Sequence, residues 1–252
     1  MKNIILISAF IGLSIIMLSI HACSKEENPT NDKTTAVFNP NISYGSLTDQ
    51  DGNNYKTVTI GSQIWMAENL RTTKYRNGDE IPEITDSTAW INLSTGAYCN
   101  YQNTRNIDTI ATFGRLYNWY TVNDSRNIAP EGWHVPNYDE WKILENNLGG
   151  DSIAGGKLKE TGTIHWQSPN KFATNESGFT ALPGGCRWGG QFNIVGGTRM
   201  ISIGKYGFWW TATEDSASNQ NAWHRHIWTG WGYVGGCKCP KIDGYSIRLV
   251  KN

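Results

Sequence analysis

Apolar positions recur on both sides of Gly61-Ser62, from Tyr55 to Ile60 and again from Ile64 to Met66. Both runs contain β-branched and aromatic residues, which favour extended strands. A glycine at the first position of a two-residue loop suits a type II′ turn, because that position requires a positive φ angle. The segment is therefore predicted to form a β-hairpin.

A helical repeat follows Asn137 in the centre of the chain. The side chain of Asn137 can cap a helix, and Glu140 stands at the position that closes a capping box. Apolar residues recur at positions i, i+3 and i+7, namely Trp141, Leu144 and Leu148. These signals predict a helix that begins after Asn137 and ends at Gly149-Gly150.

The rest of the pattern favours one more short helix and several short strands. Between Gly114 and Val122, apolar residues at i, i+3 and i+4 predict an amphipathic helix. Four short apolar runs after Thr161 predict strands: Phe179 to Leu182, Gly207 to Ala212, Ala222 to Trp228 and Tyr245 to Val250. The last run alternates, so the C-terminus is expected to complete a sheet. No fixed-period repeat is present, and we expect a single α+β domain.

The first 22 residues predict a lipoprotein signal peptide. Lys2 precedes an apolar run from Ile4 to Ile20, and this run leads to His21-Ala22-Cys23. A run of this length is borderline for crossing a bilayer, so a membrane anchor helix is the alternative interpretation. The small Ala22 before Cys23 favours cleavage there and lipidation of Cys23. Acyl chains on Cys23 anchor a domain to a membrane without a spanning helix.

Residues 23–47 are predicted to be a polar tether carrying this lipid anchor. The stretch from Ser24 to Thr35 contains no large apolar residue. Its beginning, Ser24-Lys25-Glu26-Glu27, resembles the export signals of surface lipoproteins of the Bacteroidetes, which combine a lysine with acidic residues. A solvated linker is the alternative. We expect an outer-membrane lipoprotein displayed on the cell surface.

Charge and motif content exclude several function classes. Lys+Arg and Asp+Glu number 22 each, which argues against the broad basic surface of a nonspecific nucleic-acid binder. No nucleic-acid partner is expected, and the membrane is contacted only through the lipid anchor. The sequence lacks a nucleophile elbow, a Gly-rich phosphate loop and a His-Glu-x-x-His element. We therefore predict no catalytic residue and no cofactor, and we do not expect an enzyme.

Seven ordered motifs resemble the Fibrobacter succinogenes major paralogous domain. They are Asp51-Gly52 with Ile64 to Leu70, Leu116 to Tyr120, Gly132 to Pro136 with Glu140-Trp141, Gly155 to Gly162, Asn175 to Phe179 with Leu182 to Gly185, Trp209 to Glu214, and Gly244 to Arg248. The resemblance covers residues 48–252, which we expect to form the domain. It implies no particular activity.

The segment from Pro136 to Trp141 is also similar to formylglycine-generating enzymes, whose fold is a variant of the C-type lectin fold. This resemblance implies a C-type-lectin-like domain with two main helices, a sheet that pairs the terminal strands, and a long loop region leading to a second small sheet. Those enzymes hold copper with a cysteine pair. Cys237-Lys238-Cys239 therefore suggests a copper-dependent oxidase. This hypothesis ranks third, because the two cysteines are closer together in the sequence than the copper-binding pair of those enzymes.

Four cysteines remain after lipidation, and their redox state is open. They are Cys99, Cys186, Cys237 and Cys239, which allow three full pairings that the sequence does not separate. A bond within Cys237-Lys238-Cys239 would close a very tight ring. A bond from one of these two to Cys186 or Cys99 is therefore the favoured pairing, with free thiols as the alternative.

Two of these cysteines, Cys237 and Cys239, are also candidates for a metal site. His224 and His226 on one strand, with Cys237 and Cys239 on a neighbouring strand, would face the same side, as a tetrahedral zinc site requires. Gly230, Gly235 and Gly236, which lie between the pairs, are expected to disturb the register. The four residues are therefore weak candidates, and no metal site is predicted.

The twelve tryptophans supply the main functional hypothesis, because flat aromatic faces bind both sugar rings and proteins. Five are assigned to the core: Trp65, Trp133, Trp141, Trp209 and Trp210. Trp188, Trp228 and Trp231 adjoin glycines and are predicted to form an exposed ligand platform. Ser168-Pro169-Asn170 lacks the carboxylate or amide of lectin calcium tripeptides, so calcium-dependent sugar binding is not expected there.

The sequence as a whole predicts a binding protein. The first hypothesis is a non-catalytic module, on an outer-membrane lipoprotein, that binds a glycan or an extracellular protein. The alternative is a structural or adhesin subunit that binds another bacterial surface protein.

Overall fold

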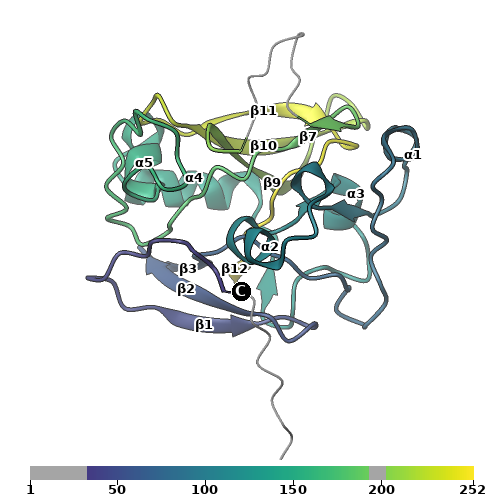
Figure 1. Cartoon of the computed structure of the whole chain (residues 1–252), viewed down its shortest axis with the longest axis horizontal. Coiled ribbons are helices and arrows are strands. Elements are labelled where there is room, and N and C mark those ends of the chain that lie inside the picture. The colour runs from purple at the N-terminus through teal and green to yellow at the C-terminus, as the bar shows by residue number, and fades with distance from the viewer. Residues whose placement is uncertain (1–32, 193–202) are drawn as a thin grey trace, which may run out of the picture. The chain divides into compact units, whose positions relative to one another are not determined.

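The computed structural model describes residues 33–192 and 203–252 (Figure 1). The predicted signal peptide, residues 1–22, and the predicted lipidation site at Cys23 lie outside the described residues. Within the described ranges, none of the helices combines the length and apolar character needed to cross a lipid bilayer.

The predicted hairpin is confirmed and belongs to a five-stranded sheet. The strands are β1 (Gly45–Thr48), β2 (Asn54–Ile60), β3 (Gln63–Met66), β12 (Val250–Lys251) and β6 (Trp133–His134), in this spatial order. Ile60 pairs with Gln63 across the turn, where Gly61 has a φ of 60°. Val250 pairs with Trp65 on one side and His134 on the other, so the C-terminus completes this sheet as expected.

A second, three-stranded antiparallel sheet contains the later strands. It consists of β9 (Tyr206–Glu214), β10 (Asn221–Trp228) and β11 (Gly235–Pro240), with β10 in the middle. Two small ladders complete the strands: β4 (Tyr98–Cys99) with β5 (Leu116–Tyr117), and β7 (Arg187–Trp188) with β8 (Gln191–Phe192). Strands are thus predicted correctly at residues 207–212 and 222–228.

The predicted central helix is α4 (Tyr138–Asn147), and both halves of its capping box are present at Asn137 and Glu140. It is followed by α5 (Asp151–Leu158), which the sequence pattern does not predict. The other helical segments are α1 (Ser87–Ile91), the 3₁₀ turn η1 (Tyr101–Asn103), α2 (Ile107–Phe113) and α3 (Trp119–Val122).

Besides the strand predicted from Tyr245 to Val250, of which only Val250 lies in a strand, two predicted elements are corrected by the structure. The helix predicted between Gly114 and Val122 is only α3, because Leu116 and Tyr117 form β5 and Asn118 caps the helix after them. The strand predicted from Phe179 to Leu182 is absent among the described strands. Thr180 adopts a φ of 53° there, and a single bridge joins Ala181 to Lys159. In both places tertiary contacts override the local pattern.

The main core lies between the two sheets, where α4 packs against both (Figure 1). It joins residues of β2, β3, α4, α5, β9 and β10, among them Val58, Trp65, Trp141, Leu158, Trp209 and Ile227. All five tryptophans assigned to the core are buried. The architecture is therefore a mixture of few helices and curled antiparallel sheets, as the α+β prediction states.

The described part of the predicted tether, residues 33–47, packs against this core. Phe38, Ile42 and Tyr44 contact the main core cluster. The backbone N–H of Val37 donates a hydrogen bond of 2.6 Å to the Glu160 carboxylate, and residues 45–48 form β1. The domain therefore begins N-terminal to the boundary predicted at Thr48, because these aromatic and aliphatic side chains find apolar partners.

Candidate functional site

The second sheet is buried on its two faces by different partners. In antiparallel strands, residues that pair directly point to the same face. Trp209 and Ile227 belong to the main core on one face. On the other face, Phe208 and Trp210 pack with Tyr245 in a separate aromatic cluster. The residues of interest lie on this second face and in the loop that joins β10 to β11.

A surface cleft of about 380 Å³ opens at the end of β10. We call it the aromatic cleft. Three short segments line it: residues 167–171, residues 205–206 and residues 228–231. The lining residues are Gln167, Ser168, Pro169, Lys171, Lys205, Tyr206, Trp228, Thr229, Gly230 and Trp231.

The aromatic rings of the cleft support one another. Tyr206 stacks on Trp228 with ring centroids 6.0 Å apart and planes 17° apart. Trp231 stands edge-on to Trp228 at 4.6 Å and leans against Tyr233 at 4.6 Å. Trp231 is 47% exposed, whereas Trp228 is half-buried. Gly230 is required beside them, because a Cβ there would lie 2.7 Å from the Trp228 ring.

Lys159 stabilises the loop of the cleft through hydrogen bonds to its backbone. Its buried ammonium group donates hydrogen bonds to the backbone carbonyls of Trp231 at 3.0 Å, Thr229 at 3.2 Å and Lys171 at 2.6 Å. Burial lowers the pKa of Lys159 to about 8, so the group remains protonated at neutral pH. Thr229 adds a hydroxyl bond to the Gln167 carbonyl at 2.5 Å. The loop is therefore pre-organised.

Polar groups in the cleft are available to a ligand. Within the described residues, the Gln167 amide and the ammonium groups of Lys171 and Lys205 form no hydrogen bond or ion pair with protein. No acidic residue is among the described residues that line the cleft. The cleft thus combines aromatic faces with two positive charges and an amide.

The structure brings together two of the three predicted platform residues. Trp228 and Trp231 line the aromatic cleft. Trp188 is not part of its lining: it lies on β7, half-buried against the aromatic cluster of Trp210 and Tyr245. The three-residue platform is corrected in this respect, because β7 pairs with β8 instead of approaching the loop after β10.

Sequence reasoning missed Lys159, Lys205 and Tyr206. Lys159 lies within the Gly155-to-Gly162 motif, but nothing in the local pattern shows that its ammonium reaches a loop 70 residues later. The side-chain amides of Asn170 and Asn175 stabilise nearby loops, because they donate hydrogen bonds to the Glu160 carbonyl and the Thr180 hydroxyl. Glu176 forms an ion pair with Lys157 at 2.9 Å.

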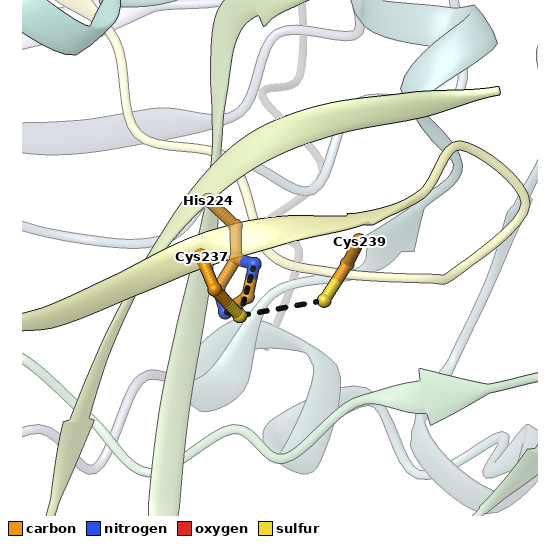
Figure 2. Close-up of side chains that lie close together, drawn as sticks. All are labelled: His224, Cys237 and Cys239. Atoms are coloured by element: carbon orange, nitrogen blue, oxygen red, sulfur yellow. Dashed lines mark hydrogen bonds between the residues drawn. The ribbon is translucent and has the colours of Figure 1, made fainter. Parts of the chain in front are cut away.

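A second constellation, the His–Cys cluster, comprises His224, His226, Cys237 and Cys239. Figure 2 shows His224 on β10 and the two cysteines on β11, with their side chains on the same side of the sheet. The two cysteine sulfurs lie 3.6 Å apart, and Cys237 Sγ lies 3.9 Å from His224 Nε2. The nearest ring nitrogens of His224 and His226 are 3.2 Å apart.

The expected disturbance of register is not observed. His224 pairs directly with Cys237, and pairing continues without a shift from Asn221 with Pro240 to His226 with Gly235. Gly235 supports this arrangement, because the imidazole of His226 lies where a Cβ would be, 2.3 Å from His226 Nε2. The structure therefore brings all four weak metal candidates to one face.

The two cysteines of the His–Cys cluster have opposite pKa shifts. The hydrogen bond from Cys239, with a further contribution from His224, lowers the pKa of Cys237. The same bond and burial raise the pKa of Cys239. Burial and the neighbouring His224 lower the pKa of His226 to about 4, which keeps its imidazole neutral. A neutral imidazole and a thiolate are the forms that bind metal ions.

The four described cysteines are free thiols, so none of the weighed disulfides is present. Cys99 and Cys186 are buried in separate clusters, and burial raises the pKa of Cys99 to about 12. Only Cys237 is exposed among them.

The chain belongs to the Fibrobacter succinogenes major domain family, whose sequence profile matches residues 58–251. This confirms the resemblance carried by the seven motifs. No curated protein and no solved structure matches the chain. The family description names no reaction, so function is argued from the two constellations above.

Proposed function

We propose that this protein is a lipid-anchored surface protein whose domain, of C-type-lectin-like fold, binds glycans without catalysis. The observation that carries the proposal is the aromatic cleft. Sugar rings present flat apolar faces of C–H groups, which pack on indole rings, and the exposed Trp231 offers such a ring at a right angle to Trp228, whose own ring stacks on Tyr206. Tryptophan supplies this contact at low cost in side-chain entropy.

The polar lining narrows the class of glycan. Lys171 and Lys205 place two ammonium groups in a cleft without described acidic residues. A sugar that carries a carboxylate or sulfate would gain charge-assisted hydrogen bonds from them. We therefore propose acidic glycans as the preferred ligands, with the Gln167 amide available to sugar hydroxyls.

The location of the protein is proposed from its first residues. Cys23 follows an apolar leader and Ala22, and the acidic stretch after it fits surface export. Protease added to intact cells should degrade the domain, whereas a domain inside the envelope would survive. Replacing Cys23 by Ser should release the protein from the membrane fraction, and retention of that variant would contradict lipid anchoring.

A protein ligand is the second candidate, favoured by one specific observation. Beside the aromatic cleft lies another cavity, of about 350 Å³, lined by Phe172, Ile153 and Lys157 among others. Phe172 is 70% exposed and Ile153 is 48% exposed. An exposed apolar patch rimmed by polar groups suits another surface protein, as an adhesin or structural subunit requires.

Residues 33–252, applied to an array of immobilised glycans and matrix proteins, test these alternatives together. Binding of the protein to acidic glycans on the array, lost in Trp231→Ala, supports the first proposal. Binding to matrix proteins alone, lost in Phe172→Ser and unaffected by Trp231→Ala, supports the second. Trp188→Ala is the matched control for removal of an indole, because Trp188 does not line the cleft. Repeating the array with a calcium chelator tests whether calcium takes part.

A further inference from the structure

The imidazoles of His224 and His226 pack against Phe208, but within the described ranges this packing leaves their ring nitrogens without partners outside the His–Cys cluster. Among the described residues, the ring nitrogens of His224 and His226 form hydrogen bonds or close polar contacts only within the cluster. His224 is 1% exposed, yet its imidazole has no backbone or carboxylate partner in the described part of the chain. Buried polar groups normally find such partners, so the ligand atoms of His224, Cys237 and Cys239, which all lie within 4.8 Å of one another, indicate a missing central partner.

Three distances within the cluster are close to the ligand–ligand edges of a tetrahedral metal site. Zinc binds sulfur at about 2.3 Å and imidazole nitrogen at about 2.0 to 2.1 Å, which gives edges of about 3.8 Å between sulfurs, about 3.6 Å between sulfur and nitrogen, and about 3.4 Å between nitrogens. The corresponding distances here are 3.6 Å, 3.9 Å and 3.2 Å. The potential ligand atoms of His224, Cys237 and Cys239 all lie within 4.8 Å of one another.

We propose that His224, Cys237 and Cys239 bind a single zinc ion, with His226 as the fourth ligand. Two thiolates and two neutral imidazoles balance the charge of Zn²⁺, and this donor set is typical of closed structural zinc sites. Cys237 is exposed and gives the ion a route from solvent, while His224 and Cys239 are buried.

Surrounding residues can hold the ligands in place. Tyr245, fully buried, donates a hydrogen bond of 3.1 Å to Asp243 and contacts Cys239. Such outer contacts orient metal ligands and tune their basicity. The ion would also clamp β10 to β11, the hairpin whose loop carries Trp231. The proposal goes beyond glycan binding and does not depend on it, since the metal can be measured without any glycan.

The test is metal binding by reduced residues 33–252, with Zn²⁺ alone and Co²⁺ alone as probes. We expect one Zn²⁺ per chain by elemental analysis after dialysis. Co²⁺ should give a thiolate charge-transfer band and the intense visible bands of tetrahedral coordination. Cys237→Ser, at an exposed position, should keep the fold and weaken Zn²⁺ binding at least about a hundredfold, and His226→Asn should weaken it about tenfold. Cys99→Ala is the matched control, because Cys99 lies outside the cluster.

Several results would overturn the proposal. One is reduced, folded protein that retains no Zn²⁺. Another is equal Zn²⁺ affinity in the wild type and Cys237→Ser. A third is uptake of Cu⁺ without any uptake of Zn²⁺. Alkylation mapped by mass spectrometry gives an independent readout: Zn²⁺ should protect Cys237, and a Cys237 that is already oxidised to a disulfide with Cys239 in protein isolated from cells would also contradict the site.

Discussion

The ammonium group of Lys159 lies 3.0 Å from the backbone carbonyl oxygen of Trp231 and connects the end of α5 to the loop of the aromatic cleft. This contact links a motif in the middle of the sequence to a loop near its C-terminal end. It explains how a loop that contains Gly230 and Gly232 can hold two indole rings in a fixed arrangement, because one buried cation satisfies several of the loop's carbonyl groups.

Replacing Lys159 by Met should therefore disorganise the cleft. Methionine has similar length but no donor, so the carbonyls of Thr229 and Trp231 lose a charged partner. We expect a loss of about 2 to 3 kcal/mol in the free energy of unfolding, measured by denaturant titration. Tryptophan fluorescence should also shift, as Trp231 becomes more mobile. Lys251→Met, at an exposed position, is the control. Unchanged stability and fluorescence would contradict the role given to Lys159.

Gly155 of α5 should not tolerate even a methyl group. A Cβ at this position would lie 2.4 Å from the Tyr233 carbonyl oxygen. Alanine normally stabilises a helix by about 1 kcal/mol relative to glycine. If Gly155→Ala were more stable than the wild type, the loop that contains Tyr233 could move away from the helix freely. We expect instead that Gly155→Ala lowers stability by about 1 to 3 kcal/mol. Ser152→Ala, on the exposed side of the same helix, should change stability little.

These glycines also show why α5 could not be predicted from the sequence. Gly155-Gly156 breaks the usual helical pattern, and glycine is unfavourable within helices. The two glycines are needed because the Tyr233 and Phe172 carbonyls approach the helix too closely for a side chain. By contrast, α4 carries its own capping box, and the hairpin at Gly61 carries its own turn, so local chemistry was sufficient for both.

The candidate site could be predicted only in part, because some of its residues are brought together by contacts between distant segments of the chain. Trp228 and Trp231 stand beside glycines in one short loop, and their exposure follows from local sequence. Lys205 and Tyr206 reach the cleft through pairing of β9 with β10, which local patterns do not encode. The His–Cys cluster was visible as a spacing, but its register depended on whether three glycines interrupt the ladder, and they do not.

Arg248 is expected to be essential for folding. Its buried guanidinium donates to Asn69 Oδ1 at 2.9 Å, to the Thr180 carbonyl at 2.8 Å and to the Phe179 carbonyl. It joins the C-terminal segment to two distant loops. Arg248→Met removes the donor of the Phe179 and Thr180 carbonyls, whereas Asn69 Oδ1 keeps its hydrogen bond from the Trp209 indole. We expect the substitution to cost about 3 to 5 kcal/mol of stability, measured by denaturant titration. Arg105→Met at an exposed position should be neutral. Equal stability of both variants would refute this assignment.

Asp243 should make stability depend on pH. Burial raises its pKa from 3.8 to about 6, although hydrogen bonds from Gly189 and Tyr245 oppose the shift. The folded state therefore binds the proton more tightly than the unfolded state. This contribution to stability is complete below about pH 4 and is lost as the pH rises through 6.

Asp243→Asn removes that titration. The stability of the wild type relative to Asp243→Asn should fall by about 2 to 3 kcal/mol between pH 4 and pH 7 and stay constant above. Thermal or denaturant unfolding with a metal chelator present measures this difference. A difference that does not vary with pH would show that Asp243 titrates normally.

Binding of acidic glycans by the aromatic cleft is tested most directly by titrating residues 33–252 with a uronic-acid oligosaccharide. We expect saturable binding by calorimetry that weakens with added salt and falls at least about tenfold in Trp231→Ala and in the double variant Lys171→Gln, Lys205→Gln. Trp188→Ala should bind like the wild type. Equal binding by the wild type and Trp231→Ala, or no binding to any glycan on the array, would contradict this proposal.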